Sequence, residues 1–484
     1  MPGFERTGLK GGYLQTLTEN EVERIHNGAL QVLSQMGIVI HDDDVLTLLD
    51  KAGGQVNRED RHALIPAQII ETAITKAPPV VTLYNRLGEQ AMTLGAGPLH
   101  ARTSSGATGI FDLDSGQRRE PTCQDAANAV RLADALPHIH GVSTMAVQPA
   151  DVPPAVVDVH TVKLALANTI KPLGYVCLNE RLIVPVLAMV AAATGGEEAL
   201  QQRPIITALA ESTSPLQLVS SQMTVLKTFA ARGLPLTLHA HPMAGFTAPV
   251  TLAGELVITH AEILALAAIA QLIRPGTPVV YGMSSSVPDM RSGVNLAGAV
   301  EIGLLGAAVA QLARRCGLPC LMSSGTDAHA PGAQAMMERL MTFLFPALAG
   351  IDLINLTTLE TKMTLSLEQW VIEEEVLNAV ERLLQGITVD DESLALDVIQ
   401  EIGPKGAFVT VDHTLRHFRE ELLTPNLFHR QPRDAWEAAG APDMQTRARE
   451  QARRILAEHH PPSLPDDVAV QLDAILKGVE ADRG

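Results

Sequence analysis

Residues 235–283, PLTLHAHPMAGFTAPVTLAGELVITHAEILALAAIAQLIRPGTPVVYGM, contain a complete strand–helix–strand pattern. The first apolar segment, Pro235–Leu238, ends in polar residues and is followed by a long stretch rich in Ala and Leu. A second apolar segment, Pro278–Met283, comes next. Apolar strands that alternate with helices are typical of parallel sheets, which helices cover on their faces. This stretch therefore predicts an α/β fold.

The same alternation extends over residues 98–386. The candidate strands are Leu99–Thr103, His140–Ala146, Leu173–Leu178, Pro204–Ala210, Pro235–Leu238, Pro278–Met283, Pro319–Met322 and Asp352–Thr357. Helical stretches centre near residues 130, 163, 187, 223, 263, 306 and 340, and one more spans Glu368–Leu384. Eight such units predict a (β/α)8 TIM-like barrel. The rival is an open doubly wound sheet, but no Gly-x-Gly-x-x-Gly motif follows the first strand.

Two further regions flank the predicted barrel. Residues 1–97 form an N-terminal helical region, and its first helix, Glu19–Met36, begins with a Thr-x-x-Glu capping box at Thr18 and Glu21. Residues 387–484 form a charged, mostly helical C-terminal extension. Each is too short and too charged to hold a core alone. We therefore expect the two regions to pack together on the barrel as one accessory layer.

The composition excludes several classes of function. The chain has 484 residues and a formal net charge of −18, so it lacks the basic surface that nucleic acids and anionic membranes attract. The longest uncharged apolar run, Ile263–Ile273, is too short to span a bilayer. The four cysteines form no Cys-x-x-Cys pair, and the first twelve residues contain no apolar run. We therefore expect a reduced, cytoplasmic protein that binds neither nucleic acid nor membrane.

Polar residues gather where the predicted strands end, which is where TIM barrels carry their active sites. Arg102 and several hydroxyl residues follow the first strand, and Ser284, Ser285 and Ser286 follow the sixth. The charged or imidazole side chains that we predict to contact a substrate are Glu211, His239, His241, Asp289, Arg291, Asp327, His329 and Glu360. No nucleophile stands beside a base, so no catalytic residue is assigned.

His239 and His241 could serve a different chemistry. Residues i and i+2 of a strand point to the same face, so both rings could bind one metal ion. Metal-dependent barrel hydrolases carry such a pair on the first strand, whereas here it lies on the fifth. We therefore expect no tightly bound metal, and a metal-dependent hydrolase remains the alternative.

Four stretches resemble one known family. They are PVTLAGELVITHAE (249–262), DMRSG (289–293), SSGTDAHAPGAQAMMERL (323–340) and the block VIEEEVLNAVERLLQGITVDDESLALDVIQEIGPKGAFVTVDHTLRHFREELLTPNLFHR (371–430). These motifs occur in the order of the trimethylamine methyltransferase family, and the resemblance covers nearly the whole chain. It implies a TIM-like barrel that moves a methyl group from a methylated amine to the cobalt of a corrinoid (cobalamin) carried by a cognate partner protein.

The founding archaeal members of that family carry pyrrolysine in the barrel. This sequence contains only standard residues, and it is similar to the bacterial members that are glycine betaine:corrinoid methyltransferases. The resemblance therefore implies a quaternary amine as substrate, glycine betaine or a related betaine. Such a cation already carries a neutral leaving group, so it needs no activating adduct.

The resemblance also implies roles for the candidate residues. A trimethylammonium group is stabilised by carboxylates and aromatic faces, for which Glu211, Asp327, Glu360, Tyr281 and Phe246 are the candidates. A betaine carboxylate needs donors, for which His239, His241, Arg291 and the serines after the sixth strand are available. We expect Tyr281, His241, Asp327 and His329 to face the mouth of the barrel. A homo-oligomer is expected, and a non-catalytic binder of quaternary amines is a further alternative.

Overall fold

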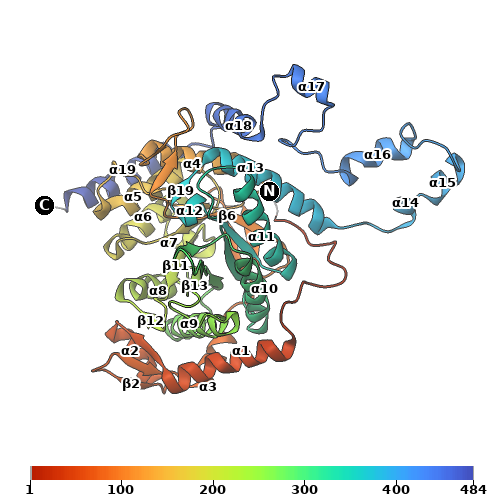
Figure 1. Cartoon of the computed structure of the whole chain (residues 1–484). Helices are drawn as coiled ribbons and strands as arrows, with labels where there is room; N and C mark the ends of the chain where they lie inside the picture. Colours follow the sequence, from red (N-terminus) through yellow and green to blue (C-terminus); the bar gives the residue numbers. More distant parts are fainter. Residues whose placement is uncertain (1–2, 483–484) are drawn as a thin grey trace.

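The computed structural model describes residues 3–482 and contains an eight-stranded parallel barrel (Figure 1). The strands are β6 (His100–Thr103), β9 (Val142–Ser143), β10 (Leu173–Tyr175), β11 (Ile206–Glu211), β13 (Leu236–Ala240), β14 (Val279–Met283), β17 (Cys320–Ser324) and β18 (Leu353–Leu356). Their order is β6-β18-β17-β14-β13-β11-β10-β9, and a parallel bridge between Arg102 and Gly141 joins the two ends of this sheet. Each strand lies at a predicted position, which confirms the TIM-like barrel.

One long helix follows each barrel strand and covers its outer face. These helices are α4 (Cys123–Ala135), α5 (Val157–Asn168), α6 (Ile183–Thr194), α8 (Ser220–Arg232), α9 (Leu252–Ile273), α10 (Val300–Arg315), α11 (Ala333–Ala349) and α13 (Leu367–Gln385). α9 is long and apolar enough to cross a membrane, but 78% of its most apolar stretch is buried inside the protein. It is therefore a core helix of this fold.

A β-hairpin closes the amino-terminal end of the barrel. Its strands β4 (Val81–Tyr84) and β5 (Gln90–Leu94) form an antiparallel pair. Four of its side chains pack in one buried cluster with three residues of β14, β17 and β18; the members are Val81, Leu83, Met92, Leu94, Val280, Leu321 and Leu353. The polar interior of the barrel therefore lies toward the carboxyl ends of the strands.

The N-terminal helices lie against α9. They are α1 (Glu19–Gln31), α2 (Asp43–Lys51) and α3 (Ala67–Ile74), accompanied by the small sheet of β12 (Gln217–Leu218), β1 (Ile38–Ile40), β3 (His62–Leu64) and β2 (Gln55–Asn57). The predicted capping box is present at the start of α1, where Thr18 and Glu21 exchange hydrogen bonds. This group of elements completes the burial of the apolar helix α9.

The C-terminal helices lie on other parts of the barrel. α18 (Met444–Glu458) packs on α13 and α4, and α19 (Asp466–Ala481) packs on α6 and α5. They lie far from α1–α3 (Figure 1), so the helices of the two terminal regions do not form the shared layer that we predicted. The two regions do meet at the turn of the β4–β5 hairpin, where Arg86 donates a hydrogen bond to the carbonyl of Pro462. The physical reason is that each terminal region buries its apolar residues against a different barrel helix. The domain boundaries after residues 97 and 386 stay predictions.

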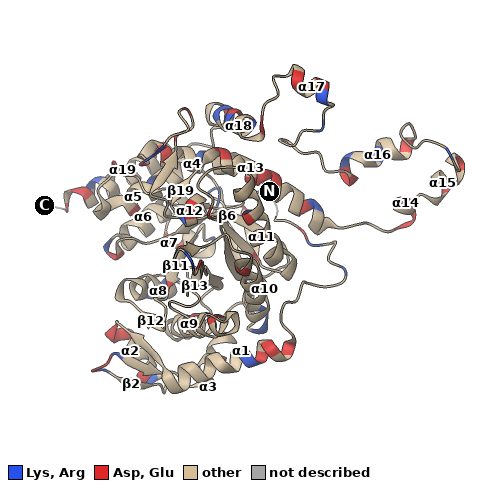
Figure 2. Ribbon diagram, in the orientation of Figure 1, with Lys and Arg blue, Asp and Glu red and all other residues tan. Residues whose placement is uncertain are grey.

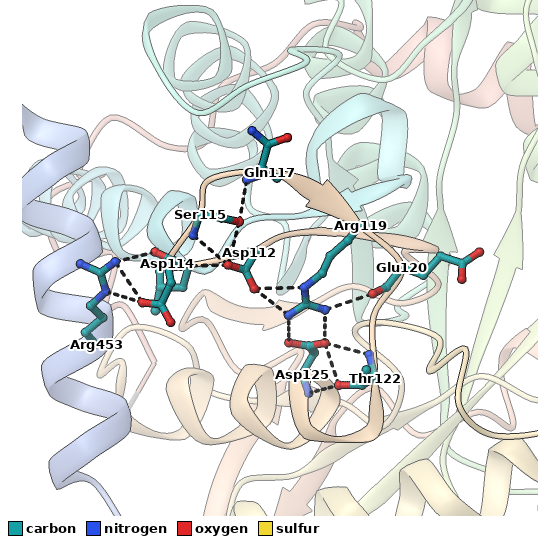
Figure 3. A network of polar contacts seen from close by, with 10 residues as sticks. Asp112, Asp114, Ser115, Gln117, Arg119, Glu120, Thr122, Asp125 and Arg453 are labelled. Atoms are coloured by element: carbon teal, nitrogen blue, oxygen red, sulfur yellow. Dashed lines mark hydrogen bonds and ion pairs between the residues drawn. The ribbon is translucent and has the colours of Figure 1, made fainter.

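Ion pairs fasten α18 to the barrel (Figure 3). Arg453 of α18 donates from Nε to Oδ1 of Asp114 at 3.0 Å. Asp114 lies in the turn between β7 (Gly109–Phe111) and β8 (Arg118–Arg119). In the same hairpin, Arg119 binds Asp112 and makes a two-pronged contact with Asp125, which also accepts the backbone N–H of Thr122 in the capping box of α4. Paired contacts of this kind fix both distance and angle.

Residues 387–425 form an arm that leaves the body and returns (Figure 1). Its helices α14 (Asp391–Leu394), α15 (Leu396–Ile402) and α16 (Asp412–Glu421) contain no buried residue. Arg382 of α13 holds the base of the arm, because it donates to the carbonyls of Gly386 at 2.7 Å and Glu421 at 3.1 Å. The returning chain is anchored at Leu427, which is buried. The chain continues through the short exposed helix α17 (Arg433–Ala438). Charged residues are frequent on α14–α18 (Figure 2).

Candidate functional site

A cavity of about 240 Å³ lies inside the barrel at the carboxyl ends of the strands. Among the residues that line it are Arg102, Glu211, His239, His241, Ser284 and Lys362. A volume at or below the lower end of typical ligand pockets suits a small molecule. The hairpin of β4 and β5 closes the other end of the barrel, so a ligand enters from the mouth.

Glu211, His239 and His241 form one group at the mouth. Glu211 ends β11, while His239 and His241 point inward from the end of β13 because alternate strand residues share a face. The Nδ1 atoms of the two rings lie 3.4 and 3.7 Å from Oε1 of Glu211. Gly282 on β14 leaves room for the His239 ring, since a Cβ there would come within 2.7 Å of its Cδ2 atom.

Lys362 completes this group from the opposite wall. Its Nζ atom donates to the hydroxyl of Ser284, and its positive charge faces Glu211. Burial lowers the pKa of Lys362 to about 8, so the ammonium form still dominates at neutral pH. Burial alone would raise the pKa of Glu211, but the contacts with His239, His241 and Lys362 hold it below its usual range. Glu211 is therefore an anchored carboxylate.

The charge of Lys362, together with burial, lowers the pKa of His241 to about 3. The imidazole of His241 is therefore neutral over the physiological range. The same positive charge disfavours a divalent cation between His239 and His241. Both Nδ1 atoms also face Glu211. A divalent ion at this pair would therefore have to overcome repulsion by Lys362, and the metal-dependent hydrolase alternative stays a prediction.

The loop that carries Lys362 has an unusual backbone. Glu360, Thr361 and Lys362 have φ angles of 52°, 53° and 80°, which non-glycine residues adopt at a cost of about 1–3 kcal/mol each. Asp327 holds this loop by accepting a hydrogen bond from the Thr361 hydroxyl at 2.6 Å. Glu360 holds it from the other side through Arg118 at 3.2 Å. From this turn the side chain of Lys362 reaches the cavity.

Three of the predicted contact residues therefore lie beside the cavity rather than in it. Asp327 accepts the backbone N–H groups of Ala297 and Gly298, both at 2.8 Å, in addition to Thr361. His329 is 89% exposed at its side chain and pairs with Glu360 at 3.3 Å. Neither Asp327 nor His329 lines the cavity, because the carboxylate of Asp327 is used in loop contacts and the ring of His329 lies in solvent, so their role as substrate contacts stays a prediction.

Tyr281 is also misplaced by the sequence interpretation. The residues of β14 that pair with the inward-facing Thr237 and His239 are Val280 and Gly282, so Tyr281 points outward between them. Its side chain is fully buried, and its hydroxyl lies 2.8 Å from Nδ1 of His260 on α9. The chain of contacts continues from His260 to His26 and from His26 to Glu71, each at 2.8 Å. Tyr281 thus joins the barrel to α9, α1 and α3.

The remaining predicted residues do not line the cavity. Phe246 is 62% exposed in the loop after β13. Asp289 and Arg291 pair with each other at 3.6 Å between the short strands β15 (Val287–Pro288) and β16 (Asn295–Leu296). Among the described residues that line the cavity, Tyr175 is the sole aromatic, and its hydroxyl is bonded to Asp158 at 2.9 Å. The predicted aromatic contacts are therefore absent from the described cavity wall.

Arg102 forms the floor of the cavity. Its Nε atom donates to Asn355 at 3.1 Å, and its Nη1 atom donates to Thr207 at 3.0 Å. Burial lowers the pKa of Arg102 to about 10, and no carboxylate among residues 3–482 pairs with it. From the sequence, Arg102 was expected near the mouth but not among the substrate contacts, and Lys362 was not expected at all. A buried, unpaired arginine has no signature in one sequence, whereas the lone Lys after Thr-Thr-Leu-Glu-Thr was visible at the end of β18.

The fold and this cavity define an enzyme-type TIM barrel whose polar site lies in its mouth. The family model for trimethylamine methyltransferase (MTTB) matches residues 8–482. The chain therefore belongs to the trimethylamine methyltransferase family, as the sequence motifs predicted.

Two curated relatives and one solved structure give the scale of the likeness. A trimethylamine methyltransferase MttB of Desulfitobacterium hafniense is 33% identical and covers 98% of this chain and 96% of the relative. A glycine betaine methyltransferase of Desulfitobacterium hafniense is 31% identical, with 95% and 96% covered. The crystal structure of the monomethylamine methyltransferase MtmB of Methanosarcina barkeri superimposes with a TM-score of 0.53 at 11% identity, with 93% of this chain and 89% of that chain covered. This last likeness confirms the fold.

Proposed function

We propose that this protein transfers a methyl group from a quaternary amine, glycine betaine or a related betaine, to the cobalt of a corrinoid carried by a partner protein. The observation that carries the proposal is the small cavity in the mouth, where Glu211 is held as a carboxylate. A carboxylate beside the neutral imidazole of His241 suits a small cation. Membership of a methyltransferase family, with a glycine betaine methyltransferase among the relatives, supports the class of reaction.

The reaction asks little covalent chemistry of the chain. The corrinoid supplies a reduced cobalt that accepts the methyl group, while the C–N bond breaks with both electrons staying on nitrogen. The amine then leaves as a neutral tertiary amine, so no proton transfer is required. The protein has to orient the donor and exclude water. Glu211 attracts the ammonium group of the donor. His239 and His241 contact the carboxylate of Glu211 and hold it in place.

The mouth also suits a partner that brings a large cofactor. A cavity of about 240 Å³ is too small for a corrinoid ring, so the cobalt has to approach from outside. Apolar side chains stand exposed in the segments that follow β13, β14 and β17: Phe246 is 62% exposed, Met290 78% and Met337 72%. Exposed apolar residues around a site are typical of surfaces that bind another protein.

Two wider expectations belong to the same proposal. The four cysteines are free, which fits a reducing compartment such as the cytoplasm. The arm of residues 387–425 exposes apolar side chains, Val409 at 73% and Leu415 at 60% among them, which fits a homo-oligomer.

Methyl transfer can be followed by the absorption change of cobalamin. Purified protein is mixed with reduced cobalamin or with a corrinoid protein, and either glycine betaine or trimethylamine is added. We expect methylation of cobalt with the betaine and none with trimethylamine. Glu211→Gln should lower kcat/KM by about 30-fold or more, the usual effect of losing one partner of a buried charge contact. The matched control is Glu437→Gln on the exposed helix α17. Activity on trimethylamine alone would refute the proposed substrate class.

A further inference from the structure

The floor of the cavity contains a positive charge without a counterion. The Nη2 atom of Arg102 makes no hydrogen bond to any residue between 3 and 482, while Nε and Nη1 bind only the neutral groups of Asn355 and Thr207. An ionised side chain that is buried without an opposite charge is costly unless a ligand compensates it. An arginine has the flat, forked arrangement of donors that matches a carboxylate.

The position of the guanidinium is built into the barrel. Arg102 reaches from β6 across β10 to Thr207 on β11. Gly174 on β10 leaves the necessary space, because a Cβ at that position would come within 2.8 Å of Nη1. Two further polar atoms of the lining residues are buried without a partner within the described chain, Oγ1 of Thr237 and Nε2 of His239. These atoms belong to residues that line the cavity, and they have unused hydrogen-bonding capacity.

The charges of the cavity are not balanced by the chain alone. Arg102 and Lys362 bring two positive charges, and Glu211 brings one negative charge. Lys362 already faces Glu211, which leaves Arg102 unmatched. A purely cationic ligand would add a third positive charge, whereas a zwitterion brings its own anion for the floor and its cation for the mouth.

The two ends of the cavity are separated along the barrel. Thr207 is the second residue of β11, and Glu211 is the last. Four strand residues span about 13 Å, so Arg102 binds deep in the barrel and Glu211 lies near the opening. A ligand whose acid group is bound at the floor would direct its other end toward the mouth, where a methyl acceptor has access.

We propose that Arg102 forms an anion subsite for the carboxylate of the methyl donor, so that the donor binds with its acid group at the floor and its methylated nitrogen toward the mouth. This inference rests on the proposed function, since it assigns the substrate class of the same cavity. It makes Arg102 the residue that selects methylated amines carrying a carboxylate over those that lack one, such as choline.

The test is equilibrium binding to the full chain by calorimetry, without any corrinoid. The ligands are glycine betaine, the longer 4-(trimethylammonio)butyrate, and choline, which keeps the cation and lacks the acid. We expect the wild-type protein to bind at least one of the two acids about 10-fold or more tighter than choline. This comparison needs no variant. Equal binding of choline and both acids would overturn the inference.

Arg102→Met then tests the residue. It removes the charge and keeps an unbranched stem, and we expect it to lower affinity for the preferred acid by about 30-fold or more while choline binding stays within about twofold. Arg102→Lys keeps the charge but loses the paired donors of the guanidinium. Its affinity for the preferred acid should lie between those of the wild type and Arg102→Met. If Arg102→Met weakens acid and choline alike, or neither, the inference is wrong.

The two proposals can fail separately. Acid-selective binding that depends on Arg102, without methyl transfer to cobalt, would refute the proposed function and leave the subsite standing. Methyl transfer from choline as fast as from either acid, and unchanged in Arg102→Met, would support the reaction class and refute the subsite.

Discussion

A Cβ atom on Gly174 would lie 2.8 Å from Nη1 of Arg102, so the absence of a side chain on β10 positions a guanidinium that starts on β6. Real Cβ atoms do not approach other heavy atoms this closely. The conflict would be relieved by moving the end of a flexible side chain, which costs the fold little. A substitution at Gly174 should therefore change ligand binding by Arg102 without changing the stability of the fold.

Gly174→Ala should displace the Arg102 guanidinium and leave the barrel intact. We expect affinity for glycine betaine or the longer acid to fall by about 10-fold or more, since a charge-assisted hydrogen bond contributes about 1.5–3 kcal/mol. The midpoint of thermal unfolding should change by less than about 3 °C, measured by circular dichroism. Gly478→Ala in α19, where a Cβ meets open space, is the matched control. Unchanged affinity for the acids would show that the displaced guanidinium does not bind them.

Lys362→Met should raise the pKa of His241 from about 3 toward its ordinary value. The charge of Lys362 is the largest cause of the low pKa, and its loss makes protonation of the imidazole less costly. Burial remains, so the recovery will be partial. Nuclear magnetic resonance titration of the ring protons measures the change directly, with Lys477→Met on the exposed face of α19 as control. A pKa of His241 that stays near 3 in Lys362→Met would mean that burial alone sets it.

Glu255→Gln should alter how stability depends on pH. Glu255 is fully buried at the start of α9, and its Oε2 atom has no partner among the described residues. Burial raises the pKa of Glu255 from 4.5 to about 8. The folded state therefore holds this proton between those two values while the unfolded state has lost it. Stability is fully present below about pH 4.5, and it falls as the pH rises toward 8.

The measurement is urea unfolding of wild type and Glu255→Gln at pH 5, 7 and 9. A glutamine stays neutral at every pH. We therefore expect the free energy of unfolding of the variant, relative to that of the wild type, to rise by on the order of 3 kcal/mol between pH 5 and pH 9. Glu450→Gln on α18 serves as the exposed control. A constant difference between the two proteins across this range would mean that Glu255 is ionised in the fold.

The barrel could be predicted from the sequence because most of its strands lie in short, mainly apolar segments. The eight segments from Leu99–Thr103 to Asp352–Thr357 each coincide with a strand, and several begin after a proline. Strands buried on both faces need such runs, and each lies between long helices that are equally visible. The packing of α1–α3 and α18–α19 could not be predicted in this way. Amphipathic faces show that a helix is covered, but they do not name the covering helix.

Residues of the site could be predicted only where they lie at the end of a recognisable strand. Glu211, His239 and His241 were found because they end β11 and β13 and, for the histidines, share the spacing of one strand face. Tyr281 was misplaced because a fully buried strand has no polar alternation that shows which residues face inward. Asp327 and Glu360 looked like substrate contacts, yet they hold the left-handed loop that directs Lys362. A single sequence does not show such indirect roles.

The arm of residues 387–425 should be dispensable for the stability of the barrel. None of the residues of α14, α15 and α16 is buried, and Arg382 holds the chain where it leaves, at Gly386, and where it returns, at Glu421. A short Gly-Ser linker in place of residues 388–420 therefore spans a small gap. We expect the unfolding midpoint in urea to stay within about 0.3 M of the wild type, because little apolar area is lost from the core.

Leu427→Ala is the contrasting variant. Leu427 is 3% exposed where the returning chain docks, and its backbone N–H donates to Glu375 at 2.8 Å. Truncating a buried leucine costs about 2–5 kcal/mol, so this single substitution should destabilise the protein far more than removal of residues 388–420, none of which is buried. Light scattering on the same samples reports the assembly state. The arm deletion could instead destabilise the protein as much as Leu427→Ala and also reduce the number of chains in the assembly. In that case the arm stabilises the protein through contacts with a second copy of the chain.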